Sequence, residues 1–210
     1  MIRTLFLAAL LALPVPALAQ DSPPAGAVEK APVFETVKVR LDTAEGPILL
    51  ALEKERAPVT TANFLKYVDQ KRLDGTSFYR AVTFSGRPEL GLIQGGAKSD
   101  PKRVLPPIAH EPTSKTGLSH TDGAISMARG APGSAQADFF ITLGALTTLD
   151  ADPAASGDNA GFAVFGKVVE GMDVVRRILA APVSQTEGVG AMKGQMIAKP
   201  IAISQVRRAD

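Results

Sequence analysis

The chain has 210 residues, with 23 Lys and Arg, 21 Asp and Glu, and no cysteine. This length suits one domain with a sizeable core, and the near balance of charge excludes a strongly basic nucleic-acid-binding protein. Without cysteine the fold has no disulfide bond, and no lipid can be attached through a thiol.

Residues 1–19 have the three parts of a secretory signal peptide. Arg3 gives a positive start, Leu5–Leu13 is an unbroken apolar run, and Ala17–Ala19 forms an A-x-A cleavage site. A membrane anchor fits poorly, because a spanning helix needs about 20 apolar residues and two prolines follow this short run. Without Arg3 the mature chain keeps 22 Lys and Arg against 21 Asp and Glu. We therefore expect a secreted, soluble product with no membrane or nucleic-acid partner.

Residues 20–34 are rich in proline and alanine and have no hydrophobic period, which predicts a flexible linker ahead of a domain at residues 35–207. The domain opens on two runs in which apolar and polar residues alternate, Val37–Asp42 and Ile48–Leu52, joined by the turn TAEG. A period of two is typical of half-buried strands, so these runs predict a β-hairpin.

A helix is expected next. Pro58 suits its first turn, Thr60 or Thr61 can cap its N-terminus, and an apolar stripe follows at helical spacing: Phe64, Leu65 and Val68. A second helix is expected at Met172–Leu179.

Short strand-like runs recur between loops that contain glycine and proline: Phe78–Val82, Leu92–Gln94, Ala124–Met127, Phe139–Thr142, Ala163–Val169 and Ile201–Val206. Many short strands with only two helices predict a closed or nearly closed antiparallel barrel whose ends the helices plug.

The usual catalytic and metal motifs are missing. The segment GGAKSD lacks the spacing of a phosphate loop, and DADPAASGDNAG lacks the sixth-position glycine and twelfth-position glutamate of a calcium loop. The only histidines, His110 and His120, lie ten residues apart without ligand spacing, and no serine sits in a nucleophile elbow. Metal catalysis and hydrolysis are therefore disfavoured.

Six blocks occur in order along residues 35–207: VTTANFLKYV, GTSFYRAV, GLIQGG, GAISMARGAPGSAQADFFI, TTLD and FAVFGKVVEGMDVVRRI. Together they resemble the cyclophilin family of peptidyl-prolyl cis-trans isomerases, and look most like its short secreted bacterial members. The resemblance implies a mainly β fold, an eight-stranded antiparallel closed β-barrel capped by two α-helices. It also implies a monomeric periplasmic isomerase of proline-containing exported polypeptides, without cofactor or metal.

The resemblance assigns catalysis to Arg80, in FYR, and to Gln94, in LIQGG. It assigns substrate binding to six residues: Phe140, Leu92, Ala128, Leu149, Phe162 and, with a weaker claim, Met127. Because neighbouring side chains alternate along a strand, Phe139 is expected in the core and Phe140 in the pocket. Tyr79 is expected on the face opposite Phe78 and Arg80, with an exposed hydroxyl and no role.

Such a site needs no nucleophile. An X–Pro bond turns slowly because amide resonance costs roughly 18–20 kcal/mol to break. An arginine that stays charged can donate to the prolyl carbonyl and nitrogen region, and Gln94 can orient it. Apolar walls that hold the ring also exclude water, which strengthens the donated bond.

Several positions depart from the family's pattern. Gly91 stands where an aromatic wall is usual, Thr148 replaces a tryptophan or phenylalanine, and Phe162 replaces a histidine. The segment Thr83–Leu90 is expected as a long rim loop from which Phe84 can replace the lost ring. These changes keep open an alternative, a proline-peptide binding module or chaperone with weak or no isomerase activity. A purely structural barrel would leave Arg80 and Gln94 unexplained.

Overall fold

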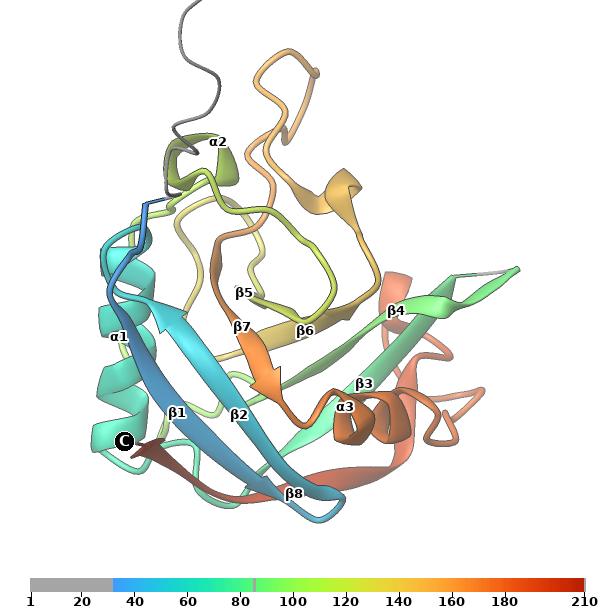
Figure 1. Ribbon diagram of the computed structural model, residues 1–210. Helices are drawn as coiled ribbons and strands as arrows, with labels where there is room; N and C mark the ends of the chain where they lie inside the picture. Colours follow the sequence, from blue (N-terminus) through green and yellow to red (C-terminus); the bar gives the residue numbers. More distant parts are fainter. Residues whose placement is uncertain (1–31, 85, 210) are drawn as a thin grey trace, which may run out of the picture. The chain divides into compact units, whose positions relative to one another are not determined.

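The computed structural model describes residues 32–84 and 86–209, and the fold is that of the unit that begins at Val33. Eight antiparallel strands close into a barrel in the order β1-β2-β7-β5-β6-β4-β3-β8 (Figure 1). Their bounds are β1 Thr36–Thr43, β2 Gly46–Glu53, β3 Thr76–Phe84, β4 Arg87–Gly96, β5 Ala124–Met127, β6 Phe139–Leu143, β7 Val164–Glu170 and β8 Met196–Ala209. The predicted closed eight-stranded barrel is confirmed. The predicted signal peptide at 1–19 and most of the linker at 20–34 lie outside the described residues.

Among the described residues there are three α-helices rather than two: α1 Pro58–Asp69, α2 Thr113–Thr116 and α3 Met172–Leu179. The additional one, α2, is a single four-residue turn. Two short 3-10 helices, η1 Thr147–Leu149 and η2 Gly190–Met192, lie in the connections. None of the helices in the described part of the chain is both long and apolar enough to cross a bilayer.

The alternation of β1 and β2 fills the barrel. Val39, Leu41, Ile48 and Leu50 are all completely buried, because every second residue of a strand points to the same face. Aromatic rings from α1, β3 and β6 join this core through edge-to-face contacts among Phe64, Phe78 and Phe139.

Helices α1 and α3 pack at opposite ends of the β1–β2 hairpin. Helix α1 starts beside the end of β2, where the amide of Ala57 donates to the carbonyl of Glu53. Helix α3 packs beside the turn between the strands, where Val174 lies against Gly46. The buried face of each helix is part of the same core, so the two helices close the barrel in the way the sequence predicted.

The N-terminus of α1 is capped by a residue that the sequence did not indicate. Pro58 begins the helix as predicted, but neither Thr60 nor Thr61 caps it. The carboxylate of Glu111 accepts from the amides of Val59 (3.1 Å) and Thr60 (2.7 Å). A carboxylate suits the amides and positive dipole end of the first turn, so Glu111 fastens α1 to a distant loop.

The segment Thr83–Leu90 is not a long loop, so that prediction is wrong. Strand β3 continues to Phe84 and β4 begins at Arg87, with Thr83 opposite Gly91 and Phe84 opposite Arg87. Residues 83–84 and 87–90 belong to a two-stranded arm that projects beyond the rest of the sheet (Figure 1). Paired backbones hold this arm, which carries Phe84 on a strand.

Candidate functional site

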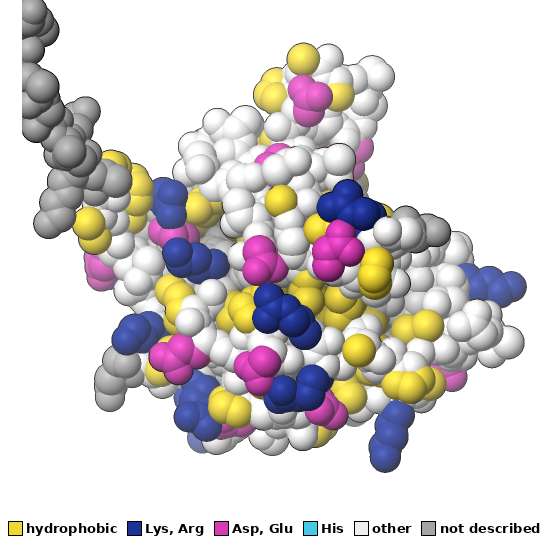
Figure 2. Space-filling model, turned by 45° about the vertical axis from the view of Figure 1, so that its right-hand side comes forward, with side chains coloured by type: hydrophobic (Ala, Val, Ile, Leu, Met, Phe, Trp, Pro, Cys, Tyr) yellow, Lys and Arg dark blue, Asp and Glu magenta, His cyan; other side chains and the backbone are white. Residues whose placement is uncertain are grey.

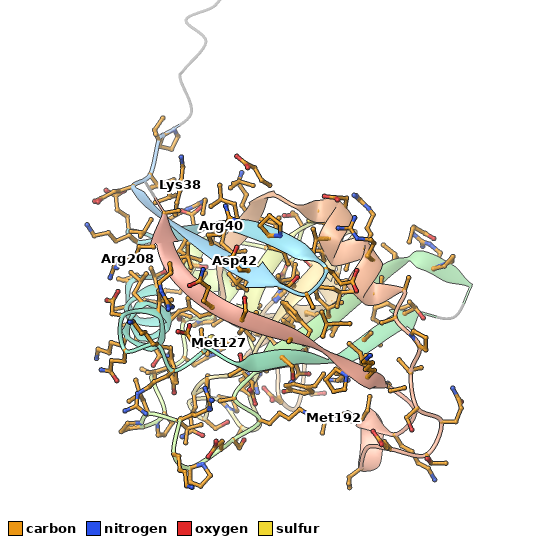
Figure 3. The ribbon with its side chains drawn as sticks, turned by 90° about the horizontal axis from the view of Figure 1, so that it is seen from below. Lys38, Arg40, Asp42, Met127, Met192 and Arg208 are labelled. Atoms are coloured by element: carbon orange, nitrogen blue, oxygen red, sulfur yellow. The ribbon has the colours of Figure 1, made fainter. Side chains whose placement is uncertain are left out.

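A cavity of about 540 Å³ opens over β3, β4 and β6. Seven of the predicted site residues line it: Arg80, Gln94, Leu92, Ala128, Phe140, Leu149 and Phe162. Met127 does not, because its side chain is 1% exposed and belongs to the core. It lies within the fold in Figure 3, whereas Met192 is at the edge of the cavity. The assignment of substrate binding to Met127 is therefore not supported by its position.

A change of register in β3 sets the direction of Arg80. Phe78 pairs with Gly95 and Arg80 with Gln94, so Tyr79 is an extra residue on β3, and the pairing with β8 shifts at the same point. A bulge of this kind reverses which residues face the core. Beyond it, Ala81 is buried in the core while Arg80, Val82 and Phe84 line the cavity.

The guanidinium of Arg80 is held by two glutamines. Its Nη1 donates to Oε1 of Gln94 at 2.8 Å, and its Nε and Nη2 donate to Oε1 of Gln195 at 2.9 and 2.6 Å. Burial lowers the pKa of Arg80 from its ordinary value, but an arginine remains protonated at any physiological pH. The site therefore offers a fixed cationic donor.

Tyr79 belongs to this arrangement, and its predicted exposure was wrong. It is 5% exposed, and its hydroxyl accepts a hydrogen bond from Nε2 of Gln94 at 2.8 Å. Burial raises the pKa of Tyr79, and the nearby carboxylate of Asp138 raises it further, so the phenol stays neutral. The bulge explains the error, because the prediction assumed unbroken alternation from Phe78 to Arg80.

The other half of the cavity is apolar. The rings of Phe140 and Phe162 meet edge to face with centroids 5.4 Å apart, and Leu92 and Leu149 also line the cavity. The guanidinium of Arg129 lies over the ring of Phe162, 5.0 Å from its centroid, and its N–H groups bond the carbonyl of Gly161. Phe139 lies in the core and Phe140 in the cavity wall, as the alternation predicted.

Gly91 leaves no gap in the wall of the cavity. A Cβ at this position would lie 2.3 Å from the carbonyl oxygen of Val82 and 3.0 Å from Leu179, so it points toward β3 and α3. Phe84 supplies an aromatic ring instead: it is 42% exposed and lines the cavity from the arm. This supports the expectation that Phe84 replaces the missing aromatic side chain.

A buried polar network lies behind Phe140. The ring of His120 stacks on that of Phe140, 5.7 Å away, and contacts Oδ1 of Asp150 at 2.5 Å and Oγ of Ser126 at 3.0 Å. These contacts have the order of a serine hydrolase triad, but His120 and Ser126 are completely buried. No substrate can reach that serine, so the network supports the cavity wall. Asp150 is used here and not in a calcium loop.

Sequence reasoning missed Gln195 and Arg129, and it gave Tyr79 no role. Gln195 lies 115 positions from the arginine that it holds, in an irregular segment without periodicity. Arg129 directly follows Ala128 in the SMARG block, but the family resemblance assigned roles there only to Met127 and Ala128. A bulge at Tyr79 has no signal in the sequence FYRAV. The roles of all three are visible only in the three-dimensional structure.

Comparison with known proteins agrees with this geometry. Residues 36–207 match the family model described as cyclophilin type peptidyl-prolyl cis-trans isomerase/CLD. The chain is 37% identical over 172 residues to peptidyl-prolyl cis-trans isomerase A of Dickeya dadantii, which covers 80% of this chain and 83% of that protein. It is 36% identical over 163 residues to a peptidyl-prolyl cis-trans isomerase of Acinetobacter baylyi, covering 76% of this chain and 80% of that protein.

A solved structure shares the fold. The cyclophilin type peptidyl-prolyl cis-trans isomerase of Cryptosporidium parvum, crystallised in the presence of the dipeptide ala-pro, superposes with a TM-score of 0.65 at 20% identity. The match covers 82% of this chain and 99% of that one. This chain belongs to the cyclophilin-type peptidyl-prolyl cis-trans isomerase family. The predicted family, barrel fold and enzyme class are thereby confirmed.

Proposed function

We propose that this prolyl isomerase acts on X–Pro bonds of exported polypeptides, with Arg80 as the catalytic donor and Gln94 as its partner. The observation that carries the proposal is a guanidinium held by hydrogen bonds at the edge of an apolar cavity. Its fixed orientation means that little reorganisation is needed when charge shifts in the substrate amide.

The proline ring is placed against Phe140, Leu92, Leu149 and Phe162, with Ala128 at the margin. These residues belong to the apolar part of the lining. Rotation about the C–N bond moves the prolyl nitrogen's lone pair out of conjugation, and Arg80 stabilises that state by donating to the prolyl carbonyl and nitrogen region. The bond order returns when rotation is complete, so no covalent intermediate, metal or cofactor takes part.

Export rests on the amino-terminal sequence. The positive start, apolar run and A-x-A site at residues 1–19 are the features of a signal peptide, and we place the mature protein in the periplasm as a monomer. On the face shown in Figure 2, Lys and Arg side chains are interspersed with Asp and Glu, which is in keeping with polypeptide clients rather than nucleic acid. Mass spectrometry of the protein from a periplasmic extract tests the proposed export, because cleavage of the signal peptide must leave Gln20 as the first residue.

The second candidate is a module that holds proline segments without isomerising them. Gly91 and Thr148 favoured it, but a side chain at position 91 would point away from the cavity, and the ring of Phe84 lines the cavity where a proline segment could meet it. Only turnover separates the two, because a binder shifts populations without accelerating their exchange.

The test is the cis-to-trans relaxation of an Ala-Pro-Phe peptide with wild type, Arg80→Ala and Arg40→Ala. Arg40 is a matched control on β1, paired with Asp42 and far from Met192 at the cavity edge (Figure 3). We expect wild type and Arg40→Ala to accelerate relaxation equally, and Arg80→Ala to lose about 100-fold or more of kcat/KM. Equal, uncatalysed rates for wild type and Arg80→Ala, with retained peptide binding, would instead establish the holding module.

A further inference from the structure

Gln195 lies between η2 and β8, on the opposite side of Arg80 from Gln94. Its side-chain oxygen accepts from both Nε and Nη2 of the arginine, at 2.9 and 2.6 Å. Its backbone carbonyl accepts from the amide of Ala81 at 3.0 Å, which fixes the residue against β3. The side chain also lines the cavity. Gln195 is therefore held in place by the backbone and extends its amide to the catalytic donor.

The two glutamines restrain different edges of the guanidinium. Gln94 contacts Nη1 alone, which leaves the group free to turn about the axis through that contact. Gln195 contacts the Nε edge at two points and removes this freedom. Of the five N–H groups of an arginine, three are used by these contacts and two remain for a substrate carbonyl.

We propose that Gln195 is a positioning residue for prolyl isomerisation. It acts through Arg80 and makes one orientation of the guanidinium permanent before substrate binds. The inference rests on the proposed function of Arg80. It adds that the η2–β8 segment, whose Ala191 and Met192 line the same cavity, forms part of the catalytic apparatus as well as part of the wall.

The variant Gln195→Met tests this, because methionine has a similar length and volume but its thioether is at best a weak acceptor for the guanidinium. Gln195→Glu retains an acceptor at the same distance and serves as the rescue. The control is Gln205→Met on the neighbouring strand β8, since Gln205 is exposed and donates to Asp42 away from the cavity. Urea unfolding of all three variants establishes that they are folded under assay conditions.

We expect Gln195→Met to lower kcat by about tenfold to 100-fold with little change in KM, because a misplaced catalytic group affects the transition state more than binding. Gln195→Glu recovers most of kcat, and Gln205→Met matches wild type. The second readout is the exchange rate of the Arg80 Nε–H proton in ¹H–¹⁵N NMR. It is slow in wild type and in Gln205→Met, and fast in Gln195→Met.

Equal kcat and equal exchange in Gln195→Met and Gln205→Met would overturn the inference. A rise in KM with unchanged kcat would also overturn it, because Gln195 would then contribute to substrate binding as part of the cavity wall only. If wild type is as slow as Arg80→Ala, the proposed function fails on that comparison. In that case the NMR exchange rate alone tests whether Gln195 restrains the guanidinium, and an Arg80 Nε–H exchange rate that is the same in Gln195→Met and wild type refutes the restraint.

Discussion

Replacing Tyr79 by phenylalanine removes a single hydroxyl from the chain of contacts behind Arg80. The protein has two tyrosines, and each accepts one hydrogen bond from an N–H donor: Tyr79 from Nε2 of Gln94 at 2.8 Å, and Tyr67 from the amide of Leu105 at 2.7 Å. Both are buried, at 5% and 1% exposed. Tyr67→Phe is therefore a matched control, with the same chemical change away from the cavity.

The two substitutions have similar expected effects on stability. In each variant a buried N–H group loses its acceptor, which costs about 1–3 kcal/mol of the free energy of unfolding. Their effects on catalysis differ. Without the hydroxyl, the Gln94 amide is no longer fixed opposite Nη1 of Arg80, and we expect kcat/KM to fall about tenfold, equivalent to ~1.4 kcal/mol of transition-state stabilisation. Tyr67→Phe stays within about twofold of wild type.

Urea unfolding measures the first quantity and relaxation of the Ala-Pro-Phe peptide the second, at a urea-free condition where all variants are folded. Comparable losses of stability with loss of activity only in Tyr79→Phe would establish Tyr79 as a support of the donor. If Tyr79→Phe loses stability but keeps the kcat/KM of Tyr67→Phe, the hydroxyl does not position Gln94 and the reasoning fails.

Three further expectations concern stability. Gly91→Ala places a Cβ 2.3 Å from the carbonyl oxygen of Val82, so we expect a loss of about 1–3 kcal/mol in urea unfolding, and a neutral result would contradict the packing. Burial lowers the pKa of His120, so as the pH falls the unfolded chain takes up a proton at this residue before the folded chain does. The free energy of unfolding therefore decreases as the pH drops below about 6.5, by at most about 1.4 kcal/mol per pH unit. Urea unfolding of His120→Asn at several pH values checks that this dependence disappears. Glu111→Gln weakens the cap of α1 by about 0.5–2 kcal/mol, and an unchanged urea midpoint would exclude that role.

The barrel was predictable where its signals are local. Alternation in Val37–Asp42 and Ile48–Leu52 and the stripe of α1 depend on residues close in sequence, and the structure places them as expected. Contacts between distant segments carry no such signal. Glu111 caps a helix 51 positions away, and Gln195 reaches Arg80 across 115 positions. The arm was missed because its exposed, polar sequence resembles a loop, although Thr83 and Phe84 on β3 pair with Gly91 and Arg87 on β4.

The family blocks predicted which residues form the site but not how they are held. Arg80, Gln94 and Phe140 line one cavity as expected, whereas Met127 is in the core. The role of Gly91 was misjudged for a physical reason. The family pattern has an aromatic residue at position 91, and its side chain was expected to face the substrate. A Cβ at this position instead points toward Val82 and Leu179.

One extra residue in β3 connects the fold to the site. Strand β3 lies between β4 and β8 in the closed barrel, so a side chain on its outer face has neighbours on both sides. Gln94 faces Arg80 across the β3–β4 pairing, and Gln195 lies just before β8, where its carbonyl accepts from the amide of Ala81 on β3, so the two glutamines reach the same guanidinium from opposite sides. Without the bulge at Tyr79, Arg80 would share the inward face of Phe78 and a charge would be buried in the barrel. The bulge turns Arg80 outward between two amides, and its extra residue supplies the hydroxyl that fixes one of them.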